Sequence, residues 1–129
     1  MRVRYSIDKQ RRLILTIAEG HVMFDDIRAH QDRLLADPDF DASFDQLIDA
    51  TAVTKFGISS DEARILADRP IVSRGSRRAF VAAEPHTFGV GRMMEIYHEG
   101  REYADVHVFQ SMNEALSWLG REEEQSRGA

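Results

Sequence analysis

Apolar and polar residues alternate at the start of the chain, as they do in a strand with one buried face. Val3, Tyr5 and Ile7 share one side of this segment, because successive side chains of a strand point to opposite faces. After a polar turn, residues 13–17 (LILTI) form a continuous apolar run, which is typical of a strand buried on both faces. Gly20 is expected to end this second strand, and the two strands are expected to form a hairpin.

The spacing of the apolar residues then becomes helical. It predicts a helix over residues 24–36, which Pro38 prevents from continuing. The two S-x-x-E sequences that begin at Ser59 and Ser111 are capping boxes, which mark helix starts, and Pro85 suits a first helical turn. Strands are expected over residues 44–50, 78–83 and 106–109, and helices over residues 59–68, 85–100 and 111–119.

The resulting order of elements is ββαβαβαβα, which predicts an α/β fold. Strands that alternate with helices imply right-handed crossovers between parallel strands. We therefore expect one domain over residues 1–120, with a five-stranded, mostly parallel sheet and four helices. Residues 121–129 (REEEQSRGA) are polar and lack an apolar anchor, so they are expected to form a flexible tail.

Composition narrows the functional classes. The 129 residues carry a net charge of −5, whereas a nucleic-acid-binding domain usually carries a basic stripe. The absence of cysteine excludes disulfides, cysteinyl zinc sites and thiol nucleophiles, and it fits a reducing cytoplasm. The longest apolar runs are a few residues, whereas a membrane-spanning helix needs about 20. We therefore expect a cytoplasmic protein with no membrane span and no nucleic-acid partner.

Four segments resemble STAS-like domains, the fold of bacterial anti-sigma factor antagonists, and closely resemble their SpoIIAA-like branch. The segments are YSIDKQRRLILTIAEG, LLADPDFDASFDQLIDATAV, SRGSRRAFVAAE and VHVFQSMNEALSWLG. The resemblance covers residues 3–120. It implies a non-catalytic regulatory or protein-interaction module in the bacterial cytoplasm, with a protein partner that the sequence does not identify.

The resemblance also implies a place for partner contact or phosphorylation. In the antagonists a strand ends in Asp, and a serine that caps the next helix is phosphorylated. Asp49 matches the strand end, and Ser59 or Ser60 falls at the matching helix start. A helix cap alone also explains these serines. Asp61 replaces the glycine of the antagonists' motif, and its charge would repel a phosphate.

Binding of a small anionic or amphipathic ligand is the alternative function. Ligands of parallel sheets bind beyond the C-terminal ends of the strands, where residues 84–92 are expected to lie. The arginine cluster at residues 74–78 enters its strand from the other end, so Arg92 is better placed than Arg77 to bind a ligand. A solvated charged face is the simpler explanation of these arginines. The candidate ligand-binding residues are His86, Phe88, Arg92, Met93 and Tyr97.

No catalytic or metal-binding motif is complete. The sequence GVGR lacks the third glycine of a dinucleotide loop, and D-x-D-x-D at residues 37–41 lacks the glycine and glutamate of a calcium loop. The five histidines show no H-E-x-x-H spacing. We therefore expect no enzyme activity, no cofactor and no metal. An uncovered sheet edge and apolar helix faces would permit a homodimer.

Overall fold

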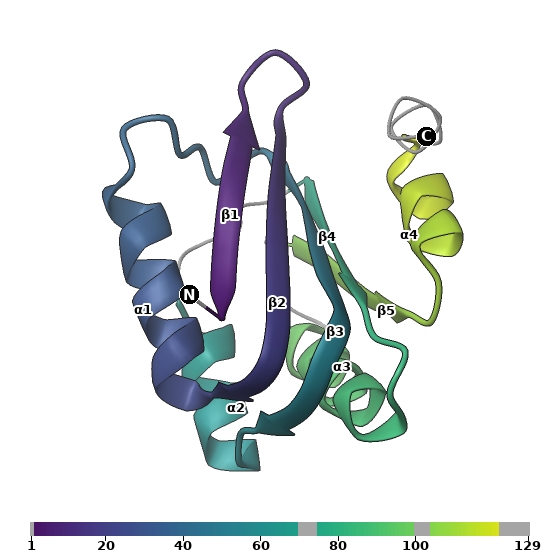
Figure 1. The fold of residues 1–129 in the computed structure, drawn as a ribbon. Helices are drawn as coiled ribbons and strands as arrows, with labels where there is room; N and C mark the ends of the chain where they lie inside the picture. The colour runs from purple at the N-terminus through teal and green to yellow at the C-terminus, as the bar shows by residue number, and fades with distance from the viewer. Residues whose placement is uncertain (1, 70–74, 100–103, 122–129) are drawn as a thin grey trace.

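The computed structural model describes residues 2–69, 75–99 and 104–121, and within them it shows one five-stranded sheet and four helices (Figure 1). The strands are β1 (Val3–Asp8), β2 (Leu13–Met23), β3 (Asp45–Gly57), β4 (Ser76–Val81) and β5 (Ala104–Phe109). The helices are α1 (Phe24–Ala36), α2 (Ser60–Ala67), α3 (Pro85–His98) and α4 (Met112–Leu119). The order of elements is the predicted ββαβαβαβα.

The strands lie in the sheet in the order in which they occur along the chain. β1 is antiparallel to β2, and each of the next three pairs is parallel. The fold prediction is therefore confirmed: an N-terminal hairpin leads into a parallel α/β sheet. No helix among the described residues is long and apolar enough to cross a membrane.

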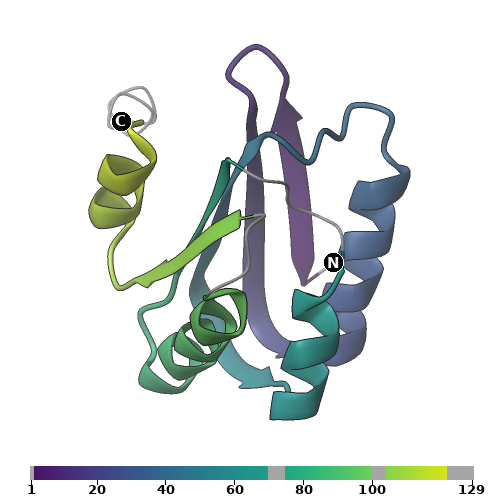
Figure 2. The same ribbon diagram turned by 180° about the vertical axis from the view of Figure 1, so that it is seen from behind.

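The two faces of the sheet are covered by different helices. Ala79 and Val81 of β4 pack with Leu116 and Leu119 of α4. Phe80 lies between them in the strand and packs instead with the cluster that includes Val90 of α3. Because side chains alternate across a strand, α4 lies on one face and α1, α2 and α3 lie on the other. The view from behind shows α4 well separated from α1 and α2 (Figure 2).

Strands β2 and β3 extend well beyond the ends that the sequence predicted. Gly20 does not end β2, because the strand continues to Met23 with register shifts on either side of Gly20, whose φ is +74°. β3 likewise continues beyond the predicted residue 50 and ends at Gly57. The two strands pair from Leu13 with Asp45 to Met23 with Gly57. Because β2 and β3 pair with each other, both strands continue past their predicted ends at Gly20 and residue 50.

The predicted helix starts are confirmed because their determinants are local. α1 spans the predicted residues. The Ser59 hydroxyl accepts a hydrogen bond from the backbone N–H of Glu62, and the Glu62 side chain accepts one from the backbone N–H of Ser59. Ser111 caps α4 in a similar way, and Gly120 ends that helix with a left-handed backbone. The predicted tail lies outside the described residues apart from Arg121, whose side chain contacts the domain.

Candidate functional site

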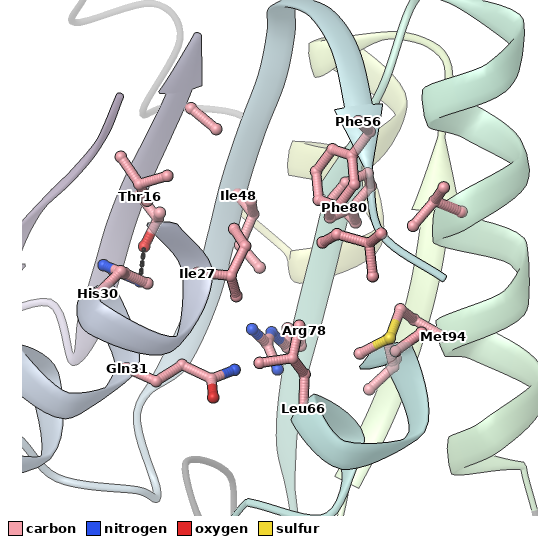
Figure 3. Close-up of a pocket in the computed structure, with 16 residues that line it drawn as sticks. Thr16, Ile27, His30, Gln31, Ile48, Phe56, Leu66, Arg78, Phe80 and Met94 are labelled. Atoms are coloured by element: carbon pink, nitrogen blue, oxygen red, sulfur yellow. Dashed lines mark hydrogen bonds between the residues drawn. The ribbon is translucent and has the colours of Figure 1, made fainter. Parts of the chain in front are cut away.

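A cavity of about 60 Å³ lies between the sheet and helices α1, α2 and α3 (Figure 3). Apolar side chains form most of its wall. Its polar groups come from the middle of β2, from α1 and from β4. The apolar residues include Ile27, Ile48, Phe56, Leu66, Phe80 and Met94, and the polar ones are Thr16, His30, Gln31 and Arg78.

Arg78 reaches the cavity because of the alternation along β4. It shares the face of Phe80 and lies next to Val106 of β5. Arg77 points to the opposite face, where its guanidinium donates a hydrogen bond to the backbone oxygen of Trp118 and lies over the Trp118 ring. Two neighbouring arginines of one strand therefore have different environments. Arg77 is exposed, whereas only 8% of Arg78 is exposed.

The Arg78 guanidinium is buried without a compensating anion. Its Nε has no hydrogen-bond partner, and no carboxylate among the described residues forms an ion pair with it. Burial lowers the pKa of Arg78 from its usual value to about 10. The side chain is therefore still a cation at neutral pH. An isolated buried charge is strongly unfavourable unless it is paired.

Helix α1 adds two successive buried polar side chains to the same wall. Gln31 is 1% exposed, and neither its amide oxygen nor its amide nitrogen has a hydrogen-bond partner in the part of the chain that the structure describes. Figure 3 shows the Gln31 amide pointing toward the Arg78 guanidinium. Buried polar groups in proteins are nearly always hydrogen-bonded. The Gln31 amide and the Arg78 Nε are thus buried polar groups that have no hydrogen-bond partner among the described residues.

His30 is a neutral member of this polar cluster. Its Nε2 lies 3.4 Å from the Thr16 hydroxyl, and its Nδ1 has no hydrogen-bond partner among the residues described. Burial, and then the positive charges of Arg78 and Arg33, lower the pKa of His30 from 6.5 to about 4. At neutral pH the cluster therefore carries a single positive charge, which is that of Arg78.

The residues of α3 that the sequence singled out lie outside the cavity. His86 is exposed, and its Nε2 lies 3.1 Å from the backbone oxygen of Phe56. Arg92 is exposed and pairs with Glu95 of the same helix. The Tyr97 hydroxyl donates to the backbone oxygen of Ser60. Phe88 and Met93 are half-buried but do not line the cavity, to which α3 contributes Val90 and Met94.

The residues implied by the antagonist resemblance lie in other places. Asp49 lies within β3 rather than at its end, and its Oδ1 accepts hydrogen bonds from the backbone N–H and the hydroxyl of Thr51. Ile48 lines the cavity, so Asp49 faces the other side of the sheet. Ser59 caps α2 and Ser60 is exposed in its first turn. Neither serine lines the cavity.

Sequence reasoning missed the three residues that form the polar cluster, although each had a signal. Arg78 is two residues before Phe80 in a strand, so alternation places an arginine on an apolar face. His30 and Gln31 fall between Ile27 and Leu34 on the same helical stripe. These local patterns do not show that this face of β4 and this stripe of α1 line the same cavity. Among the described residues, no group of three or more acidic or histidine side chains could hold a metal ion.

One solved structure is similar to the chain over almost its whole length. It is an uncharacterized protein of the DUF3478 family from Shewanella loihica PV-4, described as having a SpoIIAA-like fold. The similarity covers 91% of this chain and 93% of that chain, with a TM-score of 0.60 and 15% sequence identity. No protein-family model and no curated protein matches the sequence. The chain therefore has a SpoIIAA-like fold, as its resemblance to STAS-like domains implied.

Proposed function

We propose that the protein is a non-catalytic domain that binds a small anionic ligand in the cavity between the sheet and helices α1, α2 and α3. This was the second of the two functions that the sequence suggested. The residues that would bind the ligand are Arg78 and Gln31, in place of the α3 residues predicted from the sequence.

The buried, unpaired guanidinium of Arg78 carries this proposal. An anion in the cavity would neutralise the charge and accept hydrogen bonds from the guanidinium N–H groups. Burial excludes water from this interaction, so it is stronger than the same pair at the surface. The surrounding apolar wall suits a ligand with an apolar part, and binding sites generally combine such a wall with few polar groups.

A thermal-shift screen of the full chain against small organic anions tests the proposal, with ionic strength held constant. A ligand at 100 times its Kd adds about 2.7 kcal/mol to the free energy of unfolding, which is several degrees in a domain of this size. The shift is expected to disappear in Arg78→Met and to persist in Arg92→Met, a change at an exposed arginine outside the cavity. A shift that survives Arg78→Met, or a screen with no hit, contradicts the proposal.

A regulatory or protein-interaction role in the bacterial cytoplasm is a second candidate, favoured by two exposed isoleucines. Ile65 of α2 is 55% exposed and Ile96 of α3 is 58% exposed. Their helices contact each other where Arg64 lies over the Tyr97 ring. Ile65→Glu with Ile96→Glu is expected to abolish capture of a partner, or self-association in sedimentation, whereas Leu35→Glu on α1 leaves it intact. If the double variant and Leu35→Glu capture the partner, or self-associate, to the same extent, this role is contradicted.

A further inference from the structure

The charge of the cavity limits the ligand to a monoanion, if the proposed function holds. Arg78 supplies one positive charge, and His30 is neutral at neutral pH. A monoanion brings the cluster to zero net charge. A dianion such as sulfate or hydrogen phosphate would leave a negative charge uncompensated inside the protein, which is as unfavourable as the unpaired arginine.

The donors in the cavity match a carboxylate. A guanidinium offers N–H groups in a planar fork, which fits the two oxygens of a carboxylate. The Gln31 amide points toward the same place (Figure 3) and adds two N–H donors. A carboxylate can accept from both side chains at once, because its two oxygens offer about four lone-pair positions. Chloride lacks this geometry, and nitrate has it but carries no alkyl group for the apolar wall.

The volume of the cavity limits the length of the ligand. A single water needs about 10–15 Å³ on this measure, so about 60 Å³ holds roughly four to six atoms of that size. For comparison, an apolar cavity of about 150 Å³ binds benzene. Acetate, propionate and butyrate have the number of non-hydrogen atoms that fits. A long acyl chain would require helices α1, α2 and α3 to move away from the sheet.

We propose that the cavity binds a short-chain alkyl monocarboxylate, with its carboxylate on Arg78 and Gln31 and its alkyl group against Ile48, Phe80 and Val106. This inference rests on the proposed function and specifies its ligand class. A ligand of about four to six non-hydrogen atoms makes few contacts, so the Kd is expected to be micromolar or weaker.

NMR titration of the full chain with sodium salts at constant ionic strength tests the ligand class. The probes are acetate, propionate, butyrate, hexanoate, octanoate, nitrate and sulfate, with butyramide as the neutral analogue of butyrate. Affinity is expected to rise from acetate to butyrate and to fall at least tenfold by octanoate. Butyramide, nitrate and sulfate are expected to bind at least tenfold more weakly than butyrate. Butyrate is expected to shift the Arg78 Nε–H and Gln31 amide resonances.

Variants separate the two carboxylate-binding side chains from general effects on the fold. Arg78→Met is expected to weaken butyrate binding more than tenfold, because the charge and its donors are removed. Gln31→Met keeps the volume and charge and is expected to weaken butyrate binding by about three- to tenfold, as a single neutral hydrogen bond does. Arg92→Met is the matched control and is expected to bind butyrate as the unchanged protein does.

The outcomes distinguish a failed ligand class from a failed function. Affinity that keeps rising to octanoate, or equals that for sulfate or butyramide, overturns the short-chain monocarboxylate. If the NMR shifts caused by the ligand are lost in Arg78→Met, the proposed binding function stands and only the ligand class is wrong. The same holds if no monocarboxylate binds but another anion in the thermal-shift screen stabilises the protein in an Arg78-dependent way. Unchanged butyrate binding in Arg78→Met overturns both, as does the absence of binding in both experiments.

Discussion

The environment of Arg78 differs from that of an arginine that stabilises a fold. A structural arginine stabilises the fold through ion pairs and hydrogen bonds, and its removal is destabilising. Arg78 has no ion pair among the described residues, and burial lowers its pKa from its usual value to about 10. A change of one pKa unit corresponds to about 1.4 kcal/mol, so keeping the cation buried costs roughly 3 kcal/mol at neutral pH. The protein therefore carries a buried cation that no carboxylate among the described residues compensates.

Replacement of Arg78 by methionine is accordingly expected to stabilise the protein in the absence of ligand. Methionine keeps an unbranched apolar stem of similar length and removes the uncompensated charge. We expect the free energy of unfolding to rise by about 1–3 kcal/mol, as when buried charges are replaced by apolar side chains. Urea unfolding of both proteins measures the difference. A loss of stability in Arg78→Met would mean that the side chain has a structural role.

His30 makes the stability of the protein depend on pH. Its folded pKa is about 4, below the usual 6.5, so between these values the unfolded chain binds more protons than the folded one. Stability therefore falls as pH falls from about 6.5 toward 4, by up to roughly 3 kcal/mol for this residue. The groups that face it are Arg78 from β4, Arg33 on its own helix and the Tyr5 ring from β1.

His30→Gln removes this titration and is expected to flatten the pH profile. Urea unfolding between about pH 7 and pH 4.5 compares the two slopes, and the carboxylates that titrate in the same range cancel because both proteins contain them. As pH falls, the free energy of unfolding of the unchanged protein is expected to decrease relative to that of the variant. Parallel profiles would contradict a neutral, buried His30.

At the scale of elements, local signals predicted the helix starts and failed for the strand ends. Ser59, Ser111 and Pro85 act through their own backbone or through a residue three positions away, and a sequence displays both. The ends of β2 and β3 depend on each other, because the two strands pair over their entire length. Gly20 looks like a terminator in isolation, yet the pairing continues past it through irregular register.

The capping role of Ser59 gives a prediction for α2. Ser59→Ala removes the acceptor for the Glu62 backbone N–H and is expected to lower the free energy of unfolding by about 1 kcal/mol. Ser59→Asp is expected to retain most of the stability, because Asp is also a good cap. Ser60→Ala, at an exposed first-turn position, is the control. Equal stability of all three variants, measured by urea unfolding, would contradict the cap. Ser59→Asp therefore keeps the helix cap and also adds a negative charge, as a phosphate would. An effect of this variant on partner capture would accordingly come from the charge and not from loss of the cap.

At the scale of the whole molecule, the topology could be predicted from the sequence and the cavity could not. Apolar periodicity and capping signals establish the order of elements, and parallel crossovers then limit the topology. The cavity depends on residues as distant in sequence as Val3 and Val106. Whether Arg78 and Gln31 line the same cavity depends on how α1 packs across the sheet, and no local pattern encodes that packing. The strand ends predicted His86 and Arg92, which are exposed on α3 and lie outside the cavity.

The packing of α3 on the sheet supplies the last prediction, because two glycines of this helix have opposite environments. A Cβ at Gly91 would lie 2.5 Å from Val108 Cγ2 and 2.9 Å from Phe80 Cδ1, whereas a Cβ at Gly89 would meet no atom within 4 Å. Gly91→Ala is expected to lower the free energy of unfolding by about 1–3 kcal/mol. Gly89→Ala is expected to raise it by about 0.5–1 kcal/mol, because alanine favours the helix.

These two variants also connect helix packing to ligand size. Val90 and Met94 of α3 line the cavity, so moving α3 away from Phe80 and Val108 widens it. Gly91→Ala is therefore expected to shift the preferred carboxylate to a longer chain, and Gly89→Ala is expected to leave the preference unchanged. Urea unfolding and the same NMR titrations measure both effects. If Gly91→Ala matches Gly89→Ala in stability and chain-length preference, close packing of α3 on the sheet does not set the size of the cavity.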